Sequence, residues 1–140
     1  MASPETLWWI VSAVVLASVL YALAGYVASR RAYARFSGRS ADIQDWSSSF
    51  PDASEADCRK YLALFVEAFG LPRDDAMKFR PDDELLAIYR AIYPKHLFVA
   101  DCMEIENLAI ALDKEYGLDL LPMFHDSLRL GDIFHRIRKG

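Results

Sequence analysis

The chain begins with one long apolar run and continues with segments in which apolar and polar residues recur at helical spacing. No charged residue occurs among the 22 positions from Leu7 to Ala28. At about 1.5 Å rise per residue this run forms a helix of about 33 Å, which is long enough to cross the hydrocarbon layer of a bilayer. Because it lacks the basic start of a secretory signal, we interpret residues 1–36 as a membrane anchor, with a cleaved signal as the alternative.

Aromatic and basic residues flank the run from 7 to 28. Trp8 and Trp9 lie at one edge. Tyr26 and Tyr33 lie near the other, and amphipathic rings favour the headgroup region at both edges. The basic residues that follow are Arg30, Arg31, Arg35 and Arg39. Because positive charge beside a span tends to stay in the cytoplasm, we expect the first residues outside and the rest of the chain inside, in a bacterial inner membrane.

Residues 37–54 are rich in Ser, Asp and Gly, which is typical of a linker. The large apolar residues in it are Ile43, Trp46 and Phe50, which are candidates for docking on the domain that follows. We therefore divide the chain into an anchor over 1–36 with its basic flank, a linker over 37–54 and a helical domain over 55–140.

Four segments of the domain carry apolar residues three and four positions apart, as one buried helix face requires. They are residues 55–69, 85–93, 101–116 and 128–137. Ser54 suits the start of the first, and Gly70 and Gly117 suit the ends of the first and third. No segment alternates as a strand would. The predicted fold class is all-α: one transmembrane helix and a small bundle of about four helices.

The domain is acidic. Residues 41–140 hold 19 acidic and 12 basic side chains, a net charge of −7 against −4 for the whole chain. This balance argues against a nucleic-acid partner and favours a basic protein partner. Cys58 and Cys102 are too few for a disulfide framework, and the histidines do not fall at zinc-ligand spacing, so we predict no metal site.

Three stretches within residues 56–138 follow a recognisable order. They are "EAFGLPRDDA", "VADCMEIENLAIALDKEYGLDL" and "LRLGDIFHRI". In this order the chain resembles the acyl carrier proteins, which have a helix ending in a Gly-hydrophobic pair, an Asp-Ser-Leu before an acidic helix, and a short last helix after a Gly-Asp turn. The resemblance implies a small four-helix fold whose serine carries phosphopantetheine.

The chain departs from that family at the attachment position. Asp101, Cys102 and Met103 replace the Asp-Ser-Leu triplet, and the segment "AIYRAIYPKHLF" before it is longer than usual. Because the attachment hydroxyl is missing, we expect no standard phosphopantetheine arm and no other cofactor. Cys102 is then an inert small residue, a thiol that accepts acyl groups, or an unusual site of phosphopantetheine attachment.

Acidic residues lie along the third predicted helix, opposite its apolar stripe. They are Asp101, Glu104, Glu106, Asp113 and Glu115. Charged residues in such positions are often only a solvated face. The resemblance implies instead that they form a docking surface for a basic patch on a partner protein.

The function that we predict is that of a membrane-tethered, acyl-carrier-like interaction module, and not of an enzyme. The alternative is a working carrier held at the membrane, which loads acyl groups at Cys102 for lipid-modifying enzymes. A third hypothesis is a thiol enzyme that pairs Cys102 with His96 or His125. Replacing Cys102 with alanine separates the first hypothesis from the others, because only they need the thiol.

Overall fold

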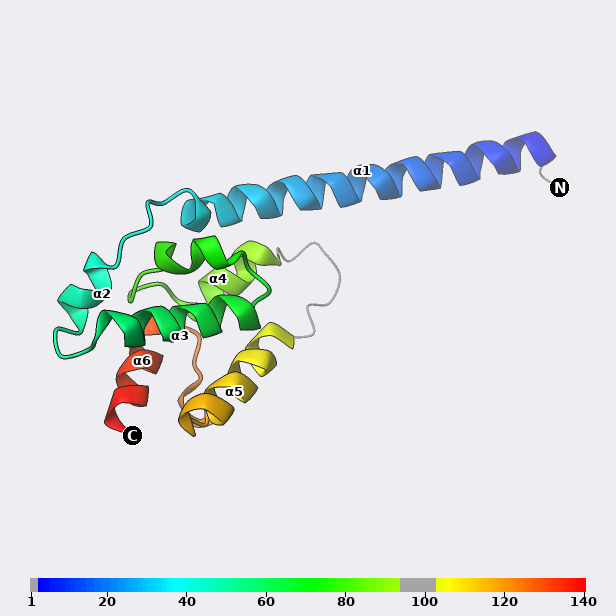
Figure 1. Cartoon of the computed structure of the whole chain (residues 1–140). Coiled ribbons are helices and arrows are strands. Elements are labelled where there is room, and N and C mark those ends of the chain that lie inside the picture. Colours follow the sequence, from blue (N-terminus) through cyan, green and yellow to red (C-terminus); the bar gives the residue numbers. More distant parts are fainter. Residues whose placement is uncertain (1–2, 94–102) are drawn as a thin grey trace.

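The computed structural model describes residues 3–93 and 103–140. Figure 1 shows one long helix that projects from a cluster of shorter helices. The chain is mostly helical, as predicted, and no strand occurs in the described residues. Within the same residues, extended backbone pairs at one isolated bridge, between Glu84 and Arg129.

Helix α1 spans Pro4–Ser37. The Ser3 side chain caps its start by accepting a hydrogen bond from the backbone N–H of Thr6. No residue in the apolar part of α1 is buried, and the helix is long and apolar enough to cross a membrane. It also continues without a break through the basic flank, so the anchor and the start of the domain share one helix.

The four predicted helices of the domain are present. They are α3 (Glu55–Ala68), α4 (Leu85–Ile92), α5 (Met103–Tyr116) and α6 (Leu130–Lys139). Two short 3-10 helices, η1 (Arg73–Lys78) and η2 (Leu121–Met123), lie in the connections. The first two residues of the predicted segment 101–116 lie outside the described residues. Ser54 caps α3 as expected, with 3.1 Å between its hydroxyl and the backbone N–H of Asp57.

The domain contains two similar units that the sequence analysis did not recognise. In each, a long helix ends at a left-handed glycine, a 3-10 turn follows, and a short helix begins after the bridge. The glycines are Gly70 and Gly117, with φ of 63° and 64°. The bridge joins the two units through backbone hydrogen bonds. The N–H of Leu85 donates to the carbonyl of Leu128 at 2.8 Å, and the N–H of Leu130 donates to the backbone carbonyl of Asp83 at 3.0 Å. This pairing fixes the starts of α4 and α6 side by side.

The segment predicted as a linker is part of the folded core. Residues 44–49 form α2 (Gln44–Ser49), and its Trp46 has 0% of its surface exposed. The Trp46 indole N–H donates to the carbonyl of Phe79 at 2.8 Å, and its ring meets those of Tyr61 and Phe134 edge-on. Ile43 and Phe50 also pack against this core. The three apolar residues in the segment therefore dock on the domain, which orders the segment.

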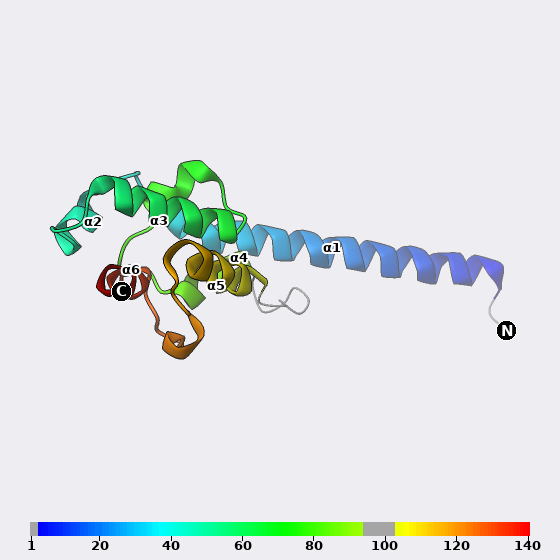
Figure 2. The same cartoon turned by 60° about the horizontal axis from the view of Figure 1, so that its bottom comes forward.

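Apolar and polar contacts hold the end of α1 against the domain. Phe36 is buried against the ring of Phe79, at 5.8 Å between centroids. The hydroxyl of Ser29 donates to the carbonyl of Ile92, the last residue of α4, at 2.6 Å. Figures 1 and 2 both show the last turns of α1 lying along α4 while the rest of α1 extends beyond the domain. Because Ser29 directly follows the apolar run, the domain begins where the predicted span ends.

Two buried carboxylates complete this junction. Asp83 accepts hydrogen bonds from both terminal nitrogens of the Arg39 guanidinium, at 2.7 and 3.0 Å, and also from the backbone N–H of Arg80. The Asp75 carboxylate accepts hydrogen bonds from the Tyr33 hydroxyl at 2.8 Å and from the Lys78 ammonium at 2.7 Å. Burial, together with the bond to Asp75, raises the pKa of Tyr33, so this hydroxyl stays a donor at physiological pH. Both carboxylates are thus paired, as buried charge requires.

Candidate functional site

Part of the predicted site lies outside the described residues, namely Asp101, Cys102 and the possible partner His96. The hypotheses about attachment at Cys102 and about a thiol enzyme therefore stay predictions. The candidates that the structure describes are Glu104, Glu106, Asp113 and Glu115, all on α5.

Helix α5 packs through its apolar stripe. Leu108 and Leu112 have no exposed surface, which anchors the helix in the core opposite its charged side. Gly117 ends the helix in the left-handed conformation. The N–H of Gly117 donates to the carbonyl of Asp113 at 2.8 Å, and the N–H of Leu118 donates to the carbonyl of Leu112 at 3.3 Å. These bonds satisfy carbonyls that a helix end leaves free, so the direction of the acidic side chains is fixed by both packing and capping.

Two of the four acidic residues face neighbouring helices. Glu104 accepts a hydrogen bond from the hydroxyl of Tyr93, at the end of α4. Glu115 forms an ion pair with Lys60 of α3, and this contact raises the pKa of the Lys60 ammonium. Glu104 and Glu115 stand about three helical turns apart on one side of α5. They brace α5 against the domain, which leaves them less available to a partner.

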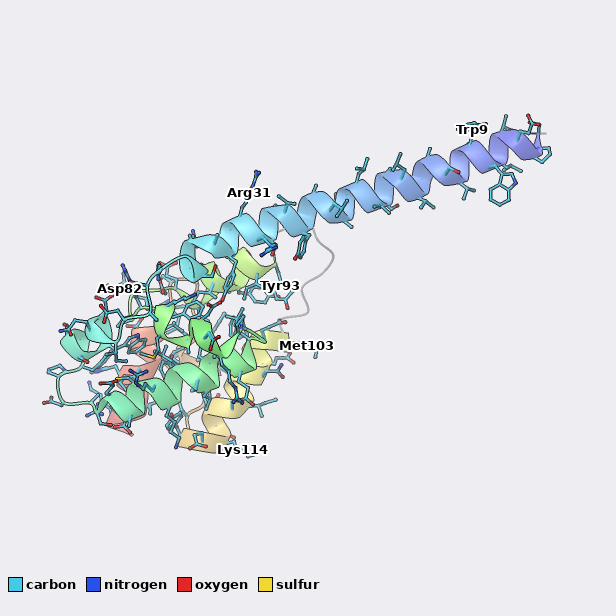
Figure 3. All side chains as sticks on the ribbon, turned by 45° about the horizontal axis from the view of Figure 1, so that its top comes forward. Trp9, Arg31, Asp82, Tyr93, Met103 and Lys114 are labelled. Atoms are coloured by element: carbon cyan, nitrogen blue, oxygen red, sulfur yellow. The ribbon has the colours of Figure 1, made fainter. Side chains whose placement is uncertain are left out.

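The other two acidic residues lie on an exposed stripe of α5. Glu106 and Asp113 are about two turns apart, and Met103 and Ile110 fall on the same face at steps of three and four. Met103 is 53% exposed and Ile110 66% exposed. Outside α1, Leu121 is the only other exposed large apolar residue in the described part of the chain. We call Met103, Glu106, Ile110 and Asp113 the α5 stripe; Figure 3 labels its first residue at one end of the helix.

The geometry therefore divides the acidic set that the sequence analysis treated as one surface. Positions 104 and 106 differ by about 200° around a helix, so adjacent acidic residues in the sequence face opposite sides. Only the pair on the α5 stripe combines exposed charge with exposed apolar surface. In the sequence, the steps of four and three between Glu106, Ile110 and Asp113 already place these residues on one helix face. That spacing could have separated Glu106 and Asp113 from the other two acidic residues.

Other candidate chemistry finds little support in the described residues. Cys58 is buried in α3, and burial, reinforced by the charge of Asp57, raises the pKa of its thiol. A higher pKa lowers the thiolate fraction at neutral pH, so Cys58 is a poor nucleophile. His125 is exposed and lies 3.2 Å from the Ser127 hydroxyl. Within residues 3–93 and 103–140, no group of three or more His, Cys, Asp or Glu side chains is arranged to hold a metal ion.

The polar junction described above was not predicted from the sequence. Arg39 was expected to belong to the basic flank, whereas its side chain reaches Asp83. Nothing in the sequence links these two residues, which are 44 positions apart. The acidic residues before Leu85 signal only the start of a helix, so this pairing became visible only in three dimensions.

Comparisons with known proteins yield no match to this chain: no family model, no curated protein and no solved structure.

Proposed function

We propose that this protein is a membrane-anchored docking module. In this proposal α1 crosses a bacterial inner membrane with its first residues outside, and the domain presents the α5 stripe to a basic protein on the cytoplasmic side. The observation that carries the proposal is the exposure of Ile110 between the carboxylates of Glu106 and Asp113, with the exposed Met103 at the end of the same stripe. An exposed apolar side chain flanked by carboxylates offers a partner both apolar contact area and a charge pattern that selects basic residues.

The chemistry of the α5 stripe specifies the kind of partner. Burial of Ile110 and Met103 would supply apolar contact area, which favours association. Glu106 and Asp113 would steer a partner that carries lysine or arginine around an apolar patch, and would disfavour acidic competitors. The net charge of −7 over residues 41–140 adds to this steering. We therefore expect affinity from the apolar pair and selectivity from the carboxylates.

We further propose that the domain is related to the acyl carrier proteins. Two element positions support this relation. The described part of α5, Met103–Tyr116, falls in the stretch where the family has its acidic helix, and α6 begins within the closing "LRLGDIFHRI" stretch. The buried α2 and the junction with α1 are additions to that pattern. In this proposal the chain keeps the family's protein-docking helix without a standard phosphopantetheine arm.

One observation favours the carrier alternative, in which Cys102 bears an acyl group for lipid-modifying enzymes. The first turn of α5 lies near the predicted membrane boundary, because Glu104 contacts Tyr93 and the neighbouring Ile92 contacts Ser29 of α1. An acyl group attached at the start of α5 would thus begin close to the bilayer. Under this alternative the thiol is essential, whereas the docking module works without it.

Site-specific photo-crosslinking in intact cells tests the docking proposal. A photo-reactive amino acid at position 110 of the full chain should yield one discrete adduct, because Ile110 lies at the centre of the proposed contact. Glu106→Lys with Asp113→Lys should reduce that adduct at least about tenfold, because each reversal turns an attraction into a repulsion. Cys102→Ala should leave it unchanged.

The matched control reverses two exposed acidic residues elsewhere, Asp74→Lys and Asp126→Lys. It alters the net charge equally, and we expect the adduct at position 110 to persist. Equal loss in both double variants would mean that only the overall charge matters, which would refute a defined docking stripe. Loss with Cys102→Ala would support the carrier alternative instead.

A further inference from the structure

We propose that the groove between the end of α1 and α4 binds the phosphate of an anionic lipid headgroup. This inference rests on the proposed membrane anchoring of α1. The groove measures about 300 Å³ and is lined by Ala32, Arg35, Ala87, Arg90 and Ala91. It thus offers two guanidinium groups over a floor of small side chains.

The groove lies at the depth of the headgroup layer. If the hydrocarbon layer ends at Ala28, Arg35 follows about 10 Å further along the axis of α1. The headgroup layer extends about 5–8 Å from the hydrocarbon edge, and helix side chains lean toward the helix N-terminus, which for α1 is the membrane side. The guanidinium of Arg35 therefore leans back toward the lipid phosphates.

Helix α4 brings Arg90 to the same depth from the other side. Ser29 contacts Ile92, whereas Arg35 reaches the carbonyl of Ala87 at 3.5 Å, so the two helices run antiparallel. Arg90 consequently starts nearer the hydrocarbon edge than Arg35, and its side chain leans away from the membrane. The two arginines thus approach one another at the level of the headgroups and line one groove.

The charges of these arginines are not balanced by carboxylates. Several arginines elsewhere in the described residues form ion pairs with Asp or Glu, for example Arg39 and Arg59. Neither Arg35 nor Arg90 forms an ion pair within residues 3–93 and 103–140. Arg35 instead stacks over the ring of Phe36, at 4.7 Å from the centroid, which holds the guanidinium in place. The Arg35 guanidinium is therefore held at the groove with no carboxylate partner among the described residues.

The position of the groove favours a lipid over a protein as the source of the anion. Basic residues next to a span attract anionic lipids, whose phosphates are present there at high local concentration. Guanidinium groups also match phosphate oxygens in shape and can donate two bonds each. Figure 3 shows Arg31 directed away from the domain, so it belongs to the general basic flank and not to this groove.

Native mass spectrometry of the full chain released from lipid nanodiscs tests this inference. Discs are prepared with equal amounts of phosphatidylglycerol and phosphatidylcholine. The wild-type chain should retain phosphatidylglycerol preferentially. Arg35→Gln with Arg90→Gln should lower the retained phosphatidylglycerol roughly tenfold, because two cationic contacts near the surface are lost. The control, Arg59→Gln with Arg136→Gln, removes two exposed arginines elsewhere and should retain lipid like the wild type.

The outcomes separate the lipid site from the anchor. If the chain enters the discs but retains both lipids equally, or if the groove variant behaves like the wild type, the lipid site is refuted and the anchor stands. If the control variant loses phosphatidylglycerol as strongly as the groove variant, binding reflects net charge only, which also refutes the site. If the wild-type chain does not enter the discs, the anchoring on which this inference rests is refuted.

Discussion

Replacing Trp46 with alanine should lower the free energy of unfolding of the domain by about 4–5 kcal/mol. The side chain is fully buried, and its ring packs against those of Tyr61 and Phe134. Truncation leaves a cavity and also removes the indole donor from the carbonyl of Phe79. For a domain of this size the midpoint of thermal unfolding should fall by roughly 20 °C or more. Near-ultraviolet circular dichroism of the full chain in detergent micelles measures this shift.

The same substitution in α1 provides the control. Trp9 is 77% exposed, so Trp9→Ala removes the same side chain without opening a cavity in the domain. We expect its unfolding midpoint to match that of the wild type. If Trp46→Ala also leaves the midpoint within a few degrees, α2 does not belong to the core, and the segment 37–54 behaves as the linker that its composition suggests.

Replacing Asp83 with alanine should destabilise the chain by about 3 kcal/mol, because its carboxylate joins α1 to the domain. The residue is buried and accepts two bonds from Arg39 and one from the backbone of Arg80. Its loss leaves the Arg39 guanidinium without a carboxylate. Arg39→Ala should have a smaller effect, because Asp83 keeps its backbone donor. Thermal unfolding in micelles gives both values, and the double variant gives the coupling between the residues.

The neighbouring Asp82 serves as the matched control. Its side chain is 90% exposed, and its contact with Arg129 at 3.4 Å lies in solvent. Asp82→Ala should therefore change the stability by less than about 0.5 kcal/mol. Equal effects at Asp82 and Asp83 would contradict the proposed role of the buried pair, since both substitutions remove the same charge from adjacent positions.

The local elements of this fold could be predicted from the sequence. Helical spacing of apolar residues located α3 to α6, and Ser54, Gly70 and Gly117 marked element ends as local capping rules suggest. These signals lie within a few positions along the chain. The apolar run from 7 to 28 likewise predicted the exposed part of α1.

The parts that escaped prediction depend on contacts distant in sequence. The composition of residues 37–54 suggests a linker, yet Trp46 finds its partners at Phe79 and Phe134. The bridge between Glu84 and Arg129 likewise joins two units through backbone groups, for which side chains give little signal. One buried tryptophan thus outweighs the polar composition around it, because its burial compensates for ordering the segment.

The helix that carries the acidic residues was predicted from the sequence, whereas their role as a site stays a prediction. Acidic residues on α5 were expected, but their division into a bracing pair and an exposed pair follows from the positions of Tyr93 and Lys60 on other helices. The predictions for Asp101 and Cys102 fall outside the described residues and stay predictions. The groove at Arg35 and Arg90 arises from the antiparallel packing of α1 and α4, which the sequence analysis did not address.

The distance between the span and the domain in a bilayer tests the central claim most directly. Spin labels are attached at Leu23→Cys in α1 and Asp82→Cys in the domain, with Cys102→Ser removing the competing thiol. Cys58 should stay unlabelled, because it is buried and its thiol pKa is raised. A second pair, Leu23→Cys with Ala34→Cys, lies within α1 and reports the width expected for one helix.

Pulsed electron paramagnetic resonance in nanodiscs should give a narrow distance distribution for the Leu23 and Asp82 pair, nearly as narrow as that within α1. The contacts of Ser29, Phe36 and Arg39 with the domain require this result. If the 18 residues from 37 to 54 instead act as a flexible linker, the distance should spread over about 20 Å or more. Such a spread would contradict a domain held in a fixed orientation at the membrane.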